Sequence, residues 1–223
     1  MSQEANLSEQ AGLRALVIGA TGAVGKDLVR QLLEDDAFGK VTLFVRRPLE
    51  VDHPKLSVHI VDFDRPEAWG DRVRGDVLFS CLGTTLKAAG SQPAQWKVDY
   101  TYQYATAKMA RDNGVRTYVL VSAVNASPES KFFYNRMKGE LELAVKQLGF
   151  PSCFILQPPS LIRKGSDRFG ERAGVAVLKA FNALSLMRSY KPMPTETVAA
   201  AMIRLAKSGR EGAETIVSQE IGK

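Results

Sequence analysis

The chain has 223 residues, of which 45% are hydrophobic and 24% are charged. This balance is typical of one globular domain and excludes a largely disordered chain, because enough apolar side chains are present to build a core. The formal net charge is +6. Much of this excess lies in residues 163–191, which we interpret as a solvated basic face. Attraction of an anionic substrate, a nucleic acid or an acidic partner is the alternative interpretation.

The cysteines and the first residues indicate the compartment. Cys81 and Cys153 are far apart and outside any Cys-x-x-Cys or Cys/His cluster, so neither a disulfide framework nor a metal site is expected. Residues 1–12 lack an apolar core and are expected to form a flexible N-terminus, not a secretory signal. No apolar run approaches the roughly 18 residues that a membrane span needs. These features predict a cytoplasmic protein without a membrane span.

Strand-like and helix-like segments alternate along the chain. Residues 15–18 form a short apolar run that leads into Gly19, as expected of a buried strand. Residues 24–33 then place apolar side chains at four-residue steps, as on one face of a helix. Further strands, rich in β-branched, aromatic or leucine residues, are expected at residues 41–45, 57–61, 77–82, 118–121 and 153–156. Further helices, each closed by a glycine, are expected at residues 94–113 (Gly114) and 130–148 (Gly149).

This alternation predicts an α/β fold, a doubly wound parallel sheet of the Rossmann type with helices on both faces. We expect residues 13–223 to form a single domain of this type, because no linker or internal repeat divides the chain. From about residue 158 onward the alternation breaks down. Residues 158–194 are therefore expected to form a small C-terminal cap on the substrate side, over the strand ends where ligands bind in such sheets.

The segment after the first strand has the spacing Gly-x-x-Gly-x-x-Gly. Glycine suits this place because the turn is tight, a pyrophosphate must approach the backbone, and helix and strand pack closely. Backbone N–H groups at the start of the helix can then bind phosphate. The strand–turn–helix context predicts a dinucleotide site rather than a purely structural turn, and the lack of a Gly-Lys-Ser/Thr sequence argues against a Walker-type nucleotidase. The residues expected to contact the cofactor here are Gly19, Thr21, Gly22, Ala23, Val24 and Gly25.

Two arginines, Arg46 and Arg47, follow the second expected strand. A site for NAD usually has an aspartate or glutamate about 20 residues after the glycines, which accepts a hydrogen bond from the ribose 2′-OH. A guanidinium in that place pairs instead with a 2′-phosphate. The sequence therefore favours NADP(H) over NAD(H), and the alternative is two solvated arginines after an edge strand.

Two further strand ends extend the expected cofactor site. Asp62 and Phe63 follow the third strand, where the Asp62 carboxylate can accept a hydrogen bond from an adenine amino group. An ordinary strand-end turn is an equal alternative for Asp62. Leu82, Gly83 and Thr84 follow the fourth strand, on the path toward the nicotinamide half of the dinucleotide.

The residues expected to carry the chemistry come later in the chain. Tyr134 and Lys138 are four residues apart in the helix expected at residues 130–148, so both side chains can point into one cleft. A phenol transfers protons poorly at neutral pH, and a cation beside it makes it a usable acid or base. Ser122 closes the fifth strand and can hydrogen-bond a substrate carbonyl while Tyr134 delivers a proton. We therefore expect Ser122, Tyr134 and Lys138 to be catalytic.

Taken together, the turn at residues 19–25, Asp62, Ser122 and the Tyr134/Lys138 pair resemble the short-chain dehydrogenase/reductase superfamily. The glycine spacing is similar to its extended and atypical branches. The segments VTLFVRRPL, CLGTT and FFYNRMKGELE resemble the atypical group that contains the Tat-interacting tumour-suppressor protein and its bacterial relatives. The resemblance implies a Rossmann fold, NADP(H) bound across the strand ends, Tyr134 as acid/base, Lys138 on the nicotinamide ribose, and Ser122 steadying the substrate.

Two departures from this family concern the chemistry and the substrate side. Residues 96–100 read Trp-Lys-Val-Asp-Tyr where many members supply an asparagine, which argues against a full proton relay. Residues 157–159 read Gln-Pro-Pro where relatives often have Arg-Pro-Gly, which alters the substrate side of the pocket.

The leading hypothesis is an NADP(H)-dependent oxidoreductase that acts on a small-molecule carbonyl or alcohol and uses no metal. The runner-up is an NADPH-binding regulatory or scaffold protein without turnover, because several members of the resembled branch act as regulators. Nucleic-acid binding through residues 163–191 is the weakest interpretation. The sequence names no substrate, and a homo-oligomer is neither predicted nor excluded.

Overall fold

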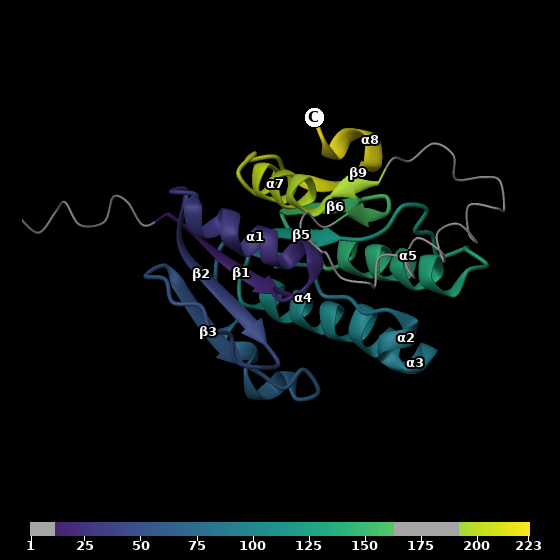
Figure 1. The fold of residues 1–223 in the computed structure, drawn as a ribbon, viewed down its shortest axis with the longest axis horizontal. Helices are drawn as coiled ribbons and strands as arrows, with labels where there is room; N and C mark the ends of the chain where they lie inside the picture. Colours follow the sequence, from purple (N-terminus) through teal and green to yellow (C-terminus); the bar gives the residue numbers. More distant parts are fainter. Residues whose placement is uncertain (1–11, 163–191) are drawn as a thin grey trace, which may run out of the picture.

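The structure, a computed structural model, describes residues 12–162 and 192–223. Its central feature is a seven-stranded sheet in the order β3-β2-β1-β4-β5-β6-β9, with all neighbouring strands parallel (Figure 1). This order confirms the predicted doubly wound Rossmann sheet. The strands are β1 (Leu13–Ile18), β2 (Phe38–Val45), β3 (Leu56–Ile60), β4 (Val77–Ser80), β5 (Thr117–Val121), β6 (Ser152–Gln157) and β9 (Gly212–Val217).

β1 lies at the centre of the sheet, paired with β2 on one side and β4 on the other. Its last four residues are apolar and buried because helices cover both faces of the sheet. Chain connections run in opposite directions on the two sides of β1. Ligands of such sheets bind in the crevice at this reversal, outside the carboxyl ends of the strands. The fold therefore places the candidate site among the segments that follow β1, β2, β4 and β5.

Two layers of helices cover the sheet (Figure 1). On one face, α1 and α7 pack together over a core that includes Leu28 and Met202. On the other face, α4 and α5 cover a second core that includes Ala107 and Leu141. The helices are α1 (Ala23–Glu34), α2 (Leu86–Ala89), α3 (Gln92–Trp96), α4 (Tyr102–Asp112), α5 (Phe133–Lys146), α7 (Thr195–Ala206) and α8 (Ser218–Ile221), with short 3-10 turns at Pro66–Ala68 and Gly70–Arg72.

The helix expected at residues 94–113 is not continuous. A π-helical segment (Lys97–Thr101) lies between α3 and α4. Such a segment fits an extra residue into the helix and often occurs at functional sites. Here it turns the side chain of Asp99 inward, where only 1% of the residue is exposed. The expected closing glycines are confirmed, since Gly114 and Gly149 have φ values of 86° and 69°.

The end of the chain differs from the expectation that the alternation stops near residue 158. β9 continues the sheet beside β6, and α7 packs on α1, so the last part of the chain belongs to the Rossmann domain. β9 is an edge strand with several exposed positions, so its sequence GAETIV lacks the continuous apolar run of a buried strand. Of the predicted cap, the structure describes β7 (Leu161–Ile162), which pairs with β8 (Met193–Pro194). Residues 1–11 of the N-terminus that the sequence predicts to be flexible, the basic residues 163–191 and thus most of the predicted cap lie outside the described residues.

No helix within residues 12–162 and 192–223 is long and apolar enough to cross a membrane. The same ranges contain no group of three or more histidine, cysteine, aspartate or glutamate side chains placed to hold a metal ion.

Candidate functional site

The glycine turn after β1 is packed so tightly that side chains are excluded at two of its positions. Gly19 has φ of 79°, and a Cβ there would lie 2.3 Å from the carbonyl carbon of Cys81, just past β4. A Cβ at Gly25 would lie 2.1 Å from the carbonyl oxygen of Gly19. The Gly22 N–H donates to that same oxygen at 2.9 Å. These contacts bring the backbone of the turn to the strand ends, as close approach of a pyrophosphate requires.

The amino end of α1 is open to an anion. The helix begins at Ala23 after Gly22, with no side-chain cap and no acidic residue in its first turn. The first N–H groups of a helix lack partners within the helix and carry the positive end of its dipole. Phosphate binding at such an end needs no additional charged side chain.

A pocket of about 370 Å³ lies beside this turn and joins four of the segments singled out in the sequence. The glycine turn, the arginine pair after β2, Phe63 after β3 and Leu82 after β4 all contribute to it. Segments that are far apart in the chain meet here because the carboxyl ends of parallel strands lie at one edge of the sheet. The lining residues are Gly19, Ala20, Thr21, Phe44, Val45, Arg46, Arg47, Pro48, Leu49, Phe63 and Leu82.

Arg46 and Arg47 are both exposed at the mouth of this pocket. Within residues 12–162 and 192–223, neither guanidinium has an acidic partner, so both are available to an anionic ligand. β2 lies between β1 and β3 in the sheet, so the arginines do not follow an edge strand. Their placement at the pocket mouth favours binding over the alternative of a merely solvated pair.

Asp62 takes part in a strand-end turn. Its carboxylate accepts a hydrogen bond from the Asp64 N–H at 2.9 Å, and its carbonyl accepts one from the Trp69 indole N–H at 2.9 Å. These bonds fit the alternative interpretation of Asp62 as a turn residue. Phe63, in contrast, reaches the pocket and packs edge-on against Trp69, with ring centroids 5.3 Å apart.

A buried ion pair joins the helix that carries the expected catalytic residues to the π-helical segment between α3 and α4. The Lys138 ammonium lies 3.6 Å from Asp99, and both side chains are almost completely buried. The other oxygen of Asp99 accepts the Thr84 N–H at 2.8 Å. Burial raises the pKa of Asp99, while the Lys138 charge and the Thr84 N–H lower it. A Cβ at Gly83 would lie 3.3 Å from the carboxylate, so this loop approaches Asp99 closely.

Tyr134 and Lys138 lie one helical turn apart at the start of α5, with different environments. Tyr134 is 40% exposed, whereas Lys138 is buried. The start of the helix is fixed to the loop after β5, because the Asn135 amide donates to the carbonyl oxygens of Val124 and Asn125 at 3.1 and 2.9 Å.

Ser122 is buried in a polar cluster with Glu142 and Gln157. Its hydroxyl donates a hydrogen bond to Glu142, and the Gln157 amide donates to both Glu142 oxygens at 3.1 and 3.0 Å. A hydroxyl has one proton to donate. While Glu142 is ionised, Ser122 donates that proton to the carboxylate, and it then offers a substrate only its oxygen lone pairs.

Three residues of this region were not singled out from the sequence. Asp99 occupies the stretch where many family members supply an asparagine, which was the available signal. Glu142 continues the four-residue spacing of Tyr134 and Lys138 along the helix. Gly139 carries no comparable signal, yet a Cβ there would lie 2.2 Å from the carbonyl carbon of Ser127. Only glycine therefore allows α5 to pack this closely on the loop after β5.

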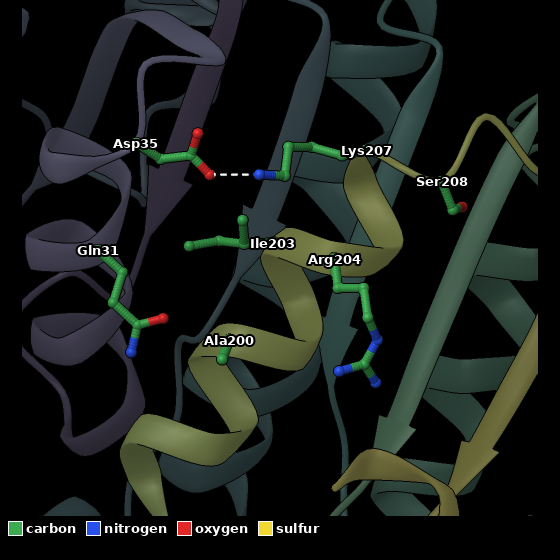
Figure 2. Close-up of a pocket in the computed structure, with 7 residues that line it drawn as sticks. All are labelled: Gln31, Asp35, Ala200, Ile203, Arg204, Lys207 and Ser208. Atoms are coloured by element: carbon green, nitrogen blue, oxygen red, sulfur yellow. Dashed lines mark hydrogen bonds and ion pairs between the residues drawn. The ribbon is translucent and has the colours of Figure 1, made fainter. Parts of the chain in front are cut away.

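A larger depression of about 530 Å³ lies between α1 and α7 (Figure 2). An ion pair of 2.6 Å joins Asp35 and Lys207 across it, just beyond the carboxyl ends of the two helices. This end faces the amino edge of the sheet, opposite the glycine turn. No residue expected to bind cofactor or carry chemistry lines it. The smaller pocket at the carboxyl edge is therefore the candidate site.

Comparisons with known proteins agree with this geometry. A family model described as NAD(P)H-binding matches residues 19–147. The protein FMP52, mitochondrial, of Meyerozyma guilliermondii is 36% identical over 197 residues, covering 86% of this chain and 84% of the relative. HTATIP2 of Rattus norvegicus is 33% identical over 194 residues, covering 84% and 78%. MoeE5, solved in complex with UDP-glucose and NAD, shares the fold at a TM-score of 0.68 and 15% identity, covering 92% of this chain and 75% of that one. The chain therefore belongs to the NAD(P)H-binding family, within the atypical short-chain dehydrogenase/reductase branch that its motifs resemble.

Proposed function

We propose that this protein is an NADP(H)-dependent oxidoreductase that transfers hydride between the cofactor and a carbonyl or alcohol group of a small molecule. The observation that carries the proposal is the pocket in which the glycine turn and the arginine pair meet. The membership of an NAD(P)H-binding family supports it. The preference for NADP(H), the substrate class and the turnover are parts of the proposal.

The residues at the carboxyl edge fit a dinucleotide that carries a 2′-phosphate. The backbone at Gly19 and Gly25 leaves no room for a Cβ, and the amino end of α1 is open to a pyrophosphate. Arg46 and Arg47 would hold the 2′-phosphate. Other residues proposed to contact the cofactor are Thr21, Gly22, Ala23, Val24, Asp62, Phe63, Leu82, Gly83, Thr84, Tyr134 and Lys138.

The proposed chemistry assigns separate tasks to the side chains at the start of α5. When bound, NADPH supplies the hydride that adds to the carbonyl carbon of the substrate. The Tyr134 hydroxyl gives its proton to the carbonyl oxygen, so that the substrate becomes an alcohol. Lys138 stabilises the phenolate left behind and holds the nicotinamide ribose. Alcohol oxidation is the same sequence in reverse, with the Tyr134 phenolate accepting the proton.

Turnover distinguishes this proposal from the alternative of a binding protein that performs no chemistry. The test mixes the purified protein and NADPH with a panel of small aldehydes and ketones and follows the loss of reduced nicotinamide together with alcohol formation. We expect both to appear in equal amounts for at least one class of carbonyl. Tight NADPH binding with no oxidation across the panel would favour the regulatory or scaffold alternative.

The compartment also belongs to the proposal. We propose the cytoplasm, as the sequence predicts. The mitochondrion is the second candidate, because the name of the Meyerozyma guilliermondii relative includes the word mitochondrial. Fractionation of cells that express the full chain separates the two locations.

The double change Arg46→Ala and Arg47→Ala is expected to weaken NADPH binding by about 10- to 100-fold. Hydrogen bonds to charged groups contribute about 1.5–3 kcal/mol, and each 1.4 kcal/mol is about tenfold in Kd. NADH lacks the 2′-phosphate, so its Kd is expected to change little. Calorimetric titration of both cofactors measures the two effects.

The matched control for the arginine pair is the double change Arg116→Ala and Arg210→Ala. It removes the same charge from two exposed arginines that precede β5 and β9, at the opposite edge of the sheet. We expect this control to bind NADPH like the unchanged protein. Equal weakening of NADPH and NADH in the Arg46/Arg47 variant would contradict the 2′-phosphate assignment.

A further inference from the structure

Glu142 is a buried carboxyl group that the proposed chemistry does not use. It lies four residues after Lys138 and eight after Tyr134, on the same face of α5. Tyr134 is 40% exposed, whereas Lys138 and Glu142 are buried, at 3% and 6%. A carboxylate is rarely buried without a partner, and Glu142 makes its hydrogen bonds to the strands beneath the helix.

Glu142 has two hydrogen-bond partners, Ser122 and Gln157, and further hydrogen bonds hold each of them in place. Ser122 follows β5, and its N–H donates to the Leu156 carbonyl at 2.8 Å. Gln157 ends β6, and its carbonyl oxygen accepts the Ser218 hydroxyl at 2.8 Å. The Gln157 amide reaches both carboxylate oxygens of Glu142, and the Ser122 hydroxyl reaches one of them. Two strand ends and one helix therefore fix the geometry of the carboxyl group.

The protonation state of Glu142 decides which kind of hydrogen bond Ser122 can offer to a ligand. An ionised carboxylate only accepts hydrogen bonds, so Ser122 must give its one proton to Glu142 and keeps only lone pairs for a ligand. A protonated carboxyl can donate to the Ser122 oxygen. The Ser122 proton is then free to point elsewhere. A carbonyl substrate needs a donor, whereas an alcohol substrate can donate its own proton to a lone pair.

We propose that Glu142 is a positioning residue whose proton switches Ser122 between a donor, which suits a carbonyl substrate, and an acceptor, which suits an alcohol. The effect of this switch on carbonyl and alcohol substrates rests on the proposed oxidoreductase function. The coupling between Ser122 and Glu142 does not rest on it, because this hydrogen bond exists within the free protein.

The groups around Glu142 shift its pKa in opposite directions. Burial raises its pKa, whereas the Ser122 and Gln157 hydrogen bonds and the charges of Lys146 and Lys138 lower it. Asp99 lies beside Lys138, and Thr215 accepts a hydrogen bond from Lys146. The thiols of Cys81 and Cys153 are also near these lysines. Burial raises the pKa of Cys81 to about 12 and that of Cys153 to about 11. Both thiols are neutral near pH 7.

The direction of the pH effect follows from this arrangement. As the pH rises through the pKa of Glu142, Ser122 changes from donor to acceptor. The kcat/KM for carbonyl reduction is expected to fall about threefold to tenfold across that range, as for the loss of one hydrogen bond. The kcat/KM for alcohol oxidation is expected to rise across the same range.

The first test uses Glu142→Gln, which fixes Ser122 in the donor state. The amide oxygen can accept from Gln157 while the amide NH₂ donates to Ser122 at every pH. We expect reduction by this variant to lose the pH dependence assigned to Glu142, and oxidation to fall about threefold to tenfold. Glu140→Gln makes the same change on the same helix at a partly exposed position, and it should keep the original profile. An unchanged profile in Glu142→Gln would overturn the switch.

The second test needs no turnover. Carbon-13 NMR follows the side-chain carboxyl of Glu142 through a pH titration, with its signal assigned by its loss in Glu142→Gln. We expect titration above the ordinary range for glutamate, and a further rise in Ser122→Ala, because that change removes a donor to the charged form. Identical titrations with and without the Ser122 hydroxyl would overturn the inference. If the Glu142 titration depends on the Ser122 hydroxyl but no carbonyl is turned over, the result would support the coupling and count against only the proposed function.

Discussion

Replacing Tyr134 by phenylalanine is expected to lower kcat for carbonyl reduction by about 10²- to 10⁴-fold, the usual contribution of a positioned acid or base. The change removes only the hydroxyl. Tyr134 is 40% exposed at the start of α5, so its loss leaves no buried group without a partner. The glycine turn, the arginine pair and the Lys138–Asp99 ion pair are untouched. NADPH affinity and stability are therefore expected to stay close to those of the unchanged protein.

The Tyr134→Phe experiment also decides between enzyme and binding protein. Steady-state kinetics gives kcat, and calorimetric titration gives the Kd for NADPH in the same preparation. Tyr104→Phe, on α4, provides the same chemical change at a position that stacks on Tyr100, and it should keep full activity. A Tyr134→Phe variant with unchanged kcat would remove Tyr134 from the mechanism.

Replacing Asp99 by leucine is expected to lower the free energy of unfolding by about 3–5 kcal/mol, the usual cost of leaving one charge of a buried pair alone. Lys138 is 3.6 Å from Asp99, and both side chains are almost completely buried. The change also removes the acceptor for the Thr84 N–H. Such a loss is a large part of the roughly 5–15 kcal/mol that stabilises a typical domain.

Companion variants keep the Asp99 test measurable if the leucine variant unfolds. Asp99→Asn retains an oxygen for Thr84 and loses only the charge, so a smaller loss is expected. The double change Asp99→Leu and Lys138→Met replaces the pair by apolar side chains and should recover most of the lost stability. Urea unfolding gives the change in the free energy of unfolding of each of these three variants from the shift in its midpoint. A double variant at least as unstable as Asp99→Leu alone would show that the pair is not coupled.

Much of the fold could be predicted because local sequence patterns match the final structure. The apolar run before Gly19 becomes β1, and the four-residue spacing that includes Leu28 becomes the buried face of α1. The interruption at Lys97–Thr101 could not be found in this way, since one extra residue in a helix barely changes its periodicity. β9 was missed because an exposed edge strand need not be apolar.

The cofactor half of the site was easier to predict than the catalytic half. Arg46 and Arg47 follow a strand and a glycine turn at a known spacing, and the structure places them at the pocket with that turn. Asp99 and Glu142 depend on contacts across the fold. Ser122 and Glu142 are separated by 20 residues and meet only because α5 packs on the sheet beside β5. A sequence pattern could supply the residue types, but not which of them meet inside the protein.

Hydrogen–deuterium exchange of the full chain with and without NADPH tests the central claim, that the cofactor binds across the carboxyl edge of the sheet. NADPH is expected to slow exchange at residues 19–25, 46–49 and 82–84 and at the start of α5. The Asp35–Lys207 depression between α1 and α7 (Figure 2) should be unaffected. Protection confined to that depression, or no protection at the glycine turn at saturating NADPH, would contradict the account.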